Sequence, residues 1–162
     1  MVLLARRFAA VAALGLWLGG FALHTAFVIP AGHRHVAGGR FGFVTGEAMS
    51  SLNFIGLVAV AVLLVDLAAE WRASGRLLRR LAAGTWLAML ATLIALFVLH
   101  SRMDALLDYS THDMTFDRGR FHALHDRYEL FATIQWGTGL IHLGCKLAGW
   151  RRTDAATPGR TR

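Results

Sequence analysis

Four long stretches of mostly apolar residues constrain the fold of this chain more than any other feature. They run over Phe8–Pro30, Ser50–Ala69, Leu81–His100 and Phe121–Leu143. A helix of about 20 apolar residues, rising 1.5 Å per residue, crosses the roughly 30 Å of hydrocarbon in a bilayer. These stretches lack the charged outer faces that the helices of a soluble bundle need. The sequence therefore predicts an all-α fold, an integral membrane four-helix bundle.

The composition favours a single membrane domain. Hydrophobic residues make up 56% of the 162 residues, whereas soluble domains are usually about 45–50% apolar. Too little chain remains for a soluble domain once the four spans are taken out. We therefore predict one four-span membrane domain over residues 1–150. The remaining residues, 151–162, are small and polar, which predicts a disordered cytoplasmic tail.

The net charge of +7 is unevenly divided between the two sides that four crossings define. The N-terminus, the second loop and the C-terminus share one side, and basic residues dominate there. The first and third loops share the other side, where acidic residues balance the arginines. The positive-inside rule then places both termini in the cytoplasm of a multi-pass protein of the bacterial inner-membrane type. Anionic lipid headgroups suffice as partners for the basic side, so we expect no nucleic-acid partner.

Small residues in the first span predict close helix packing. Gly15, Gly19 and Gly20 would let another helix approach closely, which is how helices associate in lipid. Four spans are few for a transporter that acts alone. We therefore expect a homo-oligomer if the protein moves a substrate, and the glycines of the first span are one candidate contact. An accessory subunit would instead belong to a larger membrane complex.

Several polar residues interrupt the apolar stretches. We expect Asp66 to pair with an arginine of the basic second loop, and Asn53 and Gln135 to join helices by hydrogen bonds. His142 and Cys145 lie three residues apart near the inner side, but two such residues do not make a site.

Histidines gather at the outer side of this topology. His122, His125 and Glu129 lie at i, i+3 and i+7, so they share one face of the fourth span. Imidazole and carboxylate together suit copper or zinc. We therefore predict an outer-face metal site, in which His125 is central, Glu129 lies below it and His24 lies across from it. The predicted ligands are His24, His100, His122, His125 and Glu129, with His33, His35 and His112 as weaker candidates.

Three other functional interpretations remain open. A b-type haem protein would use His24 with His125 or His100 as axial ligands from different helices. An accessory or structural membrane subunit would have no chemistry of its own, and His122 and His125 would then finish the fourth helix at the membrane surface. An enzyme is the least favoured class. The sequence shows no nucleophile–base pair and no phosphate loop, although a metal with an open position could activate water.

The layout also resembles a known family. Leu16-Trp17-Leu18-Gly19-Gly20, Pro30, Ala37-Gly38-Gly39, Phe121-His122 with His125, and Gln135-Trp136 with Gly139-Leu140 carry the likeness. With these motifs the chain resembles a family of small four-span membrane proteins of unknown function that includes the mammalian transmembrane protein two-hundred-five. The resemblance covers most of Ala10–Leu143. It implies four membrane helices and an association with tolerance of metals or metal-containing compounds, and it implies no particular reaction. The chain departs from the family at His33-Arg34-His35 and around His112.

Overall fold

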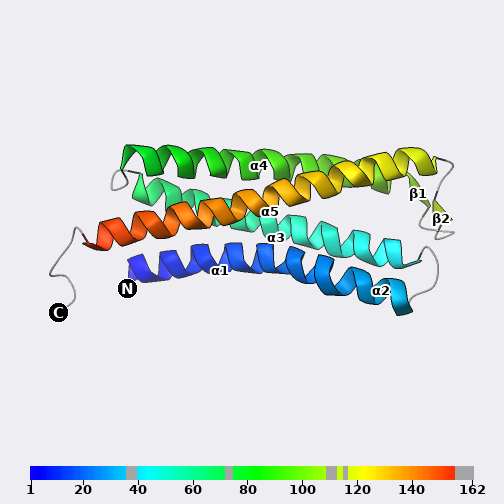
Figure 1. Ribbon diagram of the computed structural model, residues 1–162, viewed down its shortest axis with the longest axis horizontal. Helices are drawn as coiled ribbons and strands as arrows, with labels where there is room; N and C mark the ends of the chain where they lie inside the picture. Colours follow the sequence, from blue (N-terminus) through cyan, green and yellow to red (C-terminus); the bar gives the residue numbers. More distant parts are fainter. Residues whose placement is uncertain (36–39, 72–74, 109–112, 115–116, 156–162) are drawn as a thin grey trace.

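The computed structural model describes residues 1–35, 40–71, 75–108, 113–114 and 117–155. Four long helical segments run alternately in opposite directions and pack side by side (Figure 1). The start of α1 and the end of α5 lie at one end of the molecule, which we call the basic end, and β1 and β2 lie at the other (Figure 1). The elements are α1 (Val2–Leu23), the π-helix η1 (His24–Val28), α2 (Ile29–His35), α3 (Arg40–Glu70), α4 (Arg76–Asp104), β1 (Leu107–Asp108), β2 (Asp113–Met114) and α5 (Arg118–Ala155).

The helical class predicted from the sequence is confirmed. Three helices of the described chain are long and apolar enough to cross a membrane, namely Val2–Gly32, Phe43–Glu70 and Arg76–Asp104. They contain the first three predicted spans. The fourth predicted span lies within α5, which is less apolar because polar residues interrupt it. The fourth crossing therefore stays a prediction.

Each helix packs mainly against one or two neighbours. α5 lies along α4, α1 lies along α3, and α3 also contacts α4. The small antiparallel pair of β1 and β2, with Leu107 opposite Met114, lies between α4 and α5 in the sequence. α5 is therefore joined to the rest of the protein chiefly through α4.

The first helical segment changes its hydrogen-bond pattern at His24. The Ile29 N–H donates to the His24 carbonyl five residues back, as in a π-helix. Pro30 follows directly and has no N–H to donate to the preceding turn. The helix nevertheless continues past Pro30 to His35, beyond the predicted end of the first span. A π turn at such a position often marks a functional site.

Large apolar side chains fill the space between the helices. In two places glycine allows them to approach a neighbouring backbone. A Cβ at Gly56 of α3 would overlap the indole ring of Trp17, and a Cβ at Gly139 of α5 would lie 2.9 Å from Leu18 Cδ2. The largest fully buried apolar side chains are Trp17, Leu14, Leu63, Met89, Leu93 and Leu96.

The glycines that the sequence pointed to are divided between the interior and the surface. A Cβ at Gly20 would lie 2.5 Å from Leu52 Cδ2, so Gly20 packs against α3. Gly15 and Gly19 are exposed and have no atom of the described chain within 4 Å of an added Cβ. Among the described residues, these two glycines therefore lie against no neighbouring helix, and their role in an oligomer stays a prediction.

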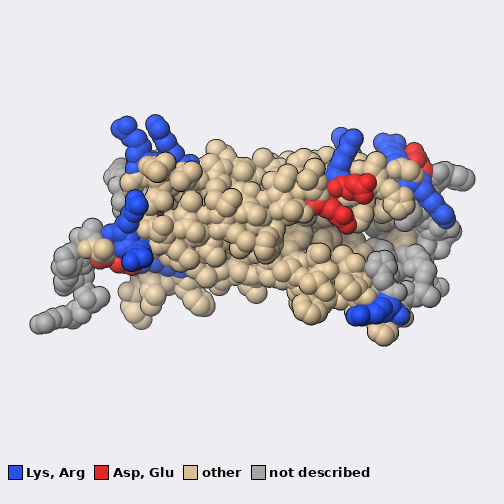
Figure 2. Space-filling model, viewed as in Figure 1, with Lys and Arg blue, Asp and Glu red and all other residues tan. Residues whose placement is uncertain are grey.

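The outer surface is apolar in the middle and charged toward the ends. Figure 2 shows a broad central band on one face without Lys, Arg, Asp or Glu, with charged side chains on either side of it. Exposed large apolar residues come from every long helix, among them Leu16, Phe54, Leu57, Ile94 and Ile141. This surface suits contact with lipid.

The helix α5 extends past residue 150, where the sequence predicted the membrane domain to end. α5 continues without a break through residues 151–155, which the sequence placed in a disordered tail. The rest of that tail, residues 156–162, lies outside the described residues.

Candidate functional site

Charged side chains meet inside the basic end of the molecule. Arg6 of α1, Asp66 and Glu70 of α3, and Lys146 of α5 form what we call the ion cluster. Arg6 Nε lies 3.1 Å from Asp66 Oδ1, Arg6 Nη2 donates to Glu70 Oε1 at 2.7 Å, and Lys146 Nζ donates to Glu70 Oε2 at 2.9 Å. Lys146 also pairs with Asp66, whose side chain is 0% exposed. The cluster therefore ties three helices together with two cations and two anions.

A second, more exposed layer continues the ion cluster toward the chain ends. Arg7 of α1 donates to Asp154 at the end of α5 over 2.8 Å. That hydrogen bond holds the pKa of the Asp154 carboxyl below its ordinary value of 3.8. The centre of the Trp150 ring lies 5.3 Å from the Arg7 guanidinium and 5.9 Å from Lys146 Nζ. Such cation–π contacts hold the Arg7 and Lys146 side chains in place.

Three pairs of polar side chains continue from the ion cluster along the interior. His142 Nδ1 lies 2.9 Å from Thr85 Oγ1. Farther along, Gln135 and Thr92 share a hydrogen bond. Near the far end, Asn53 Nδ2 donates to the Tyr128 hydroxyl at 3.1 Å. We call these three pairs, together with Lys146, the polar ladder.

The polar ladder follows the inward face of α5. Tyr128, Gln135 and His142 are seven residues apart, so they lie on one side of the helix, and all three are buried. The opposite face carries exposed apolar side chains, including Leu130, Ile134, Leu140, Ile141 and Leu147. α5 is thus polar inside and apolar outside, the reverse of a helix in a soluble bundle.

The predicted metal ligands at the far end form two separate pairs. His100 Nε2 lies 3.3 Å from Asp104 Oδ2 on α4, and the His100 ring packs 6.3 Å from the Tyr128 ring. His125 Nε2 lies 3.1 Å from Glu129 Oε1 on α5, and the two side chains are 48% and 64% exposed. The predicted i, i+4 relationship of His125 and Glu129 is therefore present, but on the outer surface of the helix.

His24, which the prediction set opposite His125, is buried. It is 4% exposed, and its Nε2 has no hydrogen-bond partner in the described part of the chain. The exposed His122 contacts the Phe121 ring beside it, and His125 stacks on the same ring at 6.2 Å. Burial of His24 and exposure of His122 and His125 give these residues different surroundings.

Of the remaining predicted ligands, the structure describes the side chain of His35 alone. His35 is exposed near the end of α2. The backbone of His33 belongs to α2, but its side chain is not described, and His112 lies outside the described residues. Within residues 1–35, 40–71, 75–108, 113–114 and 117–155, no three or more His, Cys, Asp or Glu side chains are grouped to hold a metal ion.

Sequence reasoning missed most of the ion cluster. Asp66 was expected to pair with an arginine of the second loop, but it pairs with Arg6 and Lys146 on two other helices. Lys146 was not singled out at all. The available signal was its position four residues after His142, within a run that is otherwise apolar.

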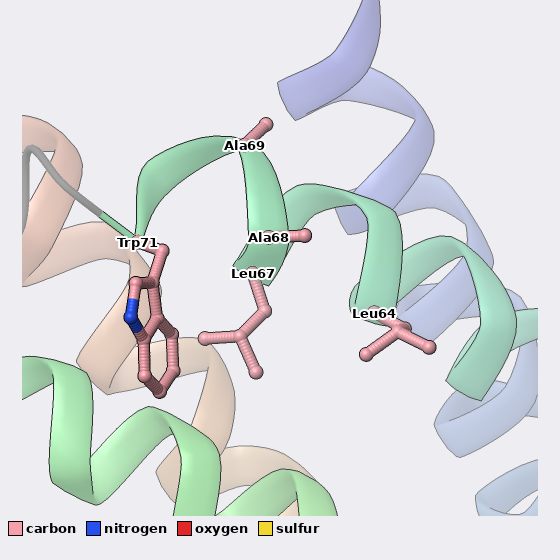
Figure 3. Close-up of a pocket in the computed structure, with 5 residues that line it drawn as sticks. All are labelled: Leu64, Leu67, Ala68, Ala69 and Trp71. Atoms are coloured by element: carbon pink, nitrogen blue, oxygen red, sulfur yellow. The ribbon is translucent and has the colours of Figure 1, made fainter.

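A hollow at the surface of α3 lies near the ion cluster. Figure 3 shows its lining, which is made entirely of apolar or aromatic side chains. Arg79 of α4 lies over the Trp71 ring at 5.2 Å and donates to the Trp71 carbonyl at 3.3 Å. The hollow supplies no group that could react or bind a metal. Its lining residues are Leu64, Leu67, Ala68, Ala69 and Trp71.

Comparisons with protein-family models, with curated proteins and with solved structures give no match for this chain. The resemblance to the small four-span family stays a prediction.

Proposed function

We propose that the chain is a four-span protein of a cell membrane, with both termini in the cytoplasm, that conducts protons through its interior. The observation that carries the proposal is the complete burial of Asp66 in an ion cluster between helices that are apolar outside. Ionisable residues within membrane spans are costly, and they commonly mark ion pathways and proton relays.

The fourth crossing is supported by the polarity of α5. Its polar residues face the other helices, while Ile134, Leu140 and Ile141 face outward. In water this arrangement would expose apolar surface and bury groups that prefer hydration. In a bilayer the same arrangement satisfies both kinds of side chain. The low average hydropathy of α5 is therefore compatible with a crossing.

The proposed orientation follows from charge. The basic end carries Arg6, Arg7, Arg76, Arg79, Arg80, Arg151 and Arg152, and both the start of α1 and the end of α5 lie there (Figure 1). Cytoplasmic ends of membrane proteins are enriched in lysine and arginine. In this orientation the ion cluster lies near the cytoplasmic face.

The charge balance of the ion cluster favours protons over larger ions. Within the ion cluster two cations face two carboxylates. Arg7 Nε also lies 3.8 Å from Glu70 Oε1, but Arg7 pairs with Asp154 as well, so the charges balance without a permanently bound counter-ion. Beyond the cluster, the ladder residues Gln135 and His142 on α5 are about 10 Å apart along the helix axis. Proton transfer over such a gap requires intervening water molecules.

Helix association alone would explain part of the ladder. The Asn53–Tyr128 and Thr92–Gln135 bonds join neutral groups, as interhelical bonds in membranes commonly do. Helix association does not explain why the titratable residues Asp66 and His142 are buried. They are the basis for proposing proton conduction rather than a purely structural subunit.

Proton flux into vesicles tests the proposal. The purified protein is reconstituted into liposomes that contain a pH-sensitive dye, and a potassium diffusion potential drives protons inward. We expect acidification faster than in protein-free liposomes, loss of this activity in Asp66→Asn, and retention in Arg80→Gln, which changes an exposed arginine at the same end. A proton flux equal to that of protein-free liposomes would contradict the proposed proton conduction.

An outer-face metal site remains a second candidate. In both His100 and His125 a carboxylate one turn away engages Nε2, which leaves Nδ1 for a metal ion. Carboxylates often orient metal-binding imidazoles in this way. The candidate ligands are those predicted from the sequence, and the metal would be copper or zinc.

Metal analysis separates this candidate from haem binding and from an accessory subunit. Stoichiometric metal that falls in His125→Ala and Glu129→Ala, but not in His142→Ala, would support the metal site. A Soret absorption band would instead identify haem. Protein without either after metal-supplemented expression, with all variants alike, would exclude both.

A further inference from the structure

The hollow on α3 runs along one face of that helix, from its end toward the middle of the span (Figure 3). Leu64, Leu67, Ala68 and Trp71 of its lining lie at i, i+3, i+4 and i+7, so they share this face. The hollow covers about 10 Å along the helix axis. Leu64 and Trp71 are 45% and 46% exposed, which shows that the hollow is open to the surroundings of the protein.

Arginines from the start of α4 surround the end of the hollow that lies at Trp71. The Arg79 guanidinium lies 5.2 Å from the centre of the Trp71 ring and donates to the Trp71 carbonyl at 3.3 Å. A guanidinium has five N–H donors, and this bond uses one of them. Arg76 and Arg80 lie within one turn of Arg79 and are exposed, and the first turn of α4 has no acidic residue. This end of the hollow is therefore positively charged.

The nearby acidic residues of α3 are engaged on the inner side of that helix. Glu70, which precedes Trp71, pairs with Arg6 and Lys146, and the fully buried Asp66 pairs with the same two cations. These contacts direct both carboxylates toward α1 and α5, away from the arginines of α4. The charge of the α4 arginines therefore remains available to an anionic ligand.

We propose that the hollow binds a phospholipid whose headgroup carries a net negative charge. One acyl chain lies along Leu64, Leu67 and Ala68, and the phosphate accepts hydrogen bonds from Arg79. Tryptophan and arginine at the end of a span lie at headgroup level, with the apolar lining below them in the hydrocarbon. Basic pockets between membrane helices on the cytoplasmic side bind anionic headgroups in this way. The inference rests on the membrane placement in the proposed function and is independent of proton conduction.

The lining of the hollow favours a lipid over a soluble phosphate. Among its side chains only the Trp71 indole can donate a hydrogen bond, and the others are aliphatic. A soluble phosphate would contact the arginines and leave the aliphatic side chains uncovered. A phospholipid satisfies the arginines and covers the apolar lining at the same time.

Fluorescence quenching by brominated lipids tests the site at Trp71. Bromine atoms on an acyl chain quench the fluorescence of a tryptophan that they contact. The protein is reconstituted into phosphatidylcholine vesicles that contain a minor fraction of brominated phosphatidylglycerol or of brominated phosphatidylcholine. The difference between the wild-type protein and Trp71→Phe gives the Trp71 signal. We expect the anionic lipid to quench this signal with an apparent affinity about fivefold higher than that of the zwitterionic lipid.

Two variants test the two parts of the site separately. Arg79→Gln should abolish the preference for the anionic lipid, whereas Arg152→Gln, which removes an exposed arginine at the same end, should keep it. Ala68→Phe should fill the hollow and lower the quenching by brominated phosphatidylglycerol. Its matched control is Val65→Phe, which adds a ring at an exposed position of α3 outside the lining. The preference is a ratio between two lipids, so a change in Trp71 fluorescence alone does not alter it.

Three results would overturn the inference. Equal quenching of Trp71 by both lipids would contradict the headgroup preference. A preference that survives both Arg79→Gln and Ala68→Phe would place the lipid elsewhere on the protein. Shielding of Trp71 from both lipids would show that another protein chain, such as a second copy, covers the hollow. Absence of proton flux in the same vesicles would contradict proton conduction and leave the lipid site standing.

Discussion

The Asp66 carboxylate and the Lys146 ammonium form an ion pair between α3 and α5, with 0% and 5% of the two side chains exposed. Partners this far apart in the sequence meet because α3 and α5 both end at the basic end (Figure 1). Each member has one further ion-pair partner, Arg6 for Asp66 and Glu70 for Lys146. Since neither ion is solvated by water, each depends on its partner to balance its charge.

Removal of one member of this pair should therefore strongly lower the stability of the folded protein. In Lys146→Met, Asp66 keeps Arg6 but loses its closest cation, and loss of one partner of a buried pair typically costs about 3–5 kcal/mol. Unfolding in detergent micelles, followed by circular dichroism against a denaturant, measures the change. The double variant Asp66→Leu/Lys146→Met should recover much of the loss, because no unpaired ion remains. Equal stability of Lys146→Met and wild type would contradict the buried pairing.

Glycine at position 56 should be required for packing. The Cβ of Gly56→Ala would overlap the Trp17 ring, which lies fully buried and has little room to shift. Overpacking of this kind costs about 1–3 kcal/mol. The matched control is Gly15→Ala, where an added methyl meets open space. Thermal unfolding should show a lower stability for Gly56→Ala than for Gly15→Ala. If Gly56→Ala is as stable as the wild-type protein, α1 and α3 are less closely packed than described.

Cysteine labelling in membrane vesicles should report the topology. In a Cys145→Ser background, a cysteine at Gly75, before α4, should react with a membrane-impermeant maleimide only from the cytoplasmic side. A cysteine at Asp117, before α5, should react only from the other side. Both positions are exposed. Labelling of both from the same side would exclude passage of α4 across the membrane.

The Arg7–Asp154 hydrogen bond should be measurable as a pKa change. In Arg7→Gln, the pKa of the Asp154 carboxyl should rise toward its ordinary value of 3.8 because the donor is lost. The wild-type bond stabilises the folded protein above this ordinary value, and its contribution disappears as the pH falls through the lowered folded pKa. Carbon NMR of labelled aspartate follows the titration. Arg80→Gln is the control, and a shift there as large as in Arg7→Gln would argue against a local bond.

The sequence alone predicted the helices and the presence of polar contacts between them. Asn53 and Gln135 were predicted to join helices, and both predictions are confirmed by bonds to Tyr128 and Thr92. The partners themselves could not be predicted, because they depend on how far each helix rotates about its axis. That rotation is fixed by tertiary packing, such as Trp17 against Gly56.

The same rotation explains the outer histidines. His125 and Glu129 do share a helix face, as their spacing predicted. Leu124 and Tyr128 take the inward positions, which leaves His125 and Glu129 on the outer side of α5. Apolar periodicity could not indicate this, because the inward face of α5 is itself rich in polar residues.

The inverted polarity of α5 also bears on how the protein is made. Alone in lipid, a helix that carries Lys146, His142 and Gln135 on one face would expose groups that the bilayer cannot solvate. Their partners, Asp66, Thr85 and Thr92, lie on α3 and α4, which the ribosome completes first. A crossing by α5 would therefore require this helix to dock onto α3 and α4, already in the membrane, rather than to enter the lipid alone.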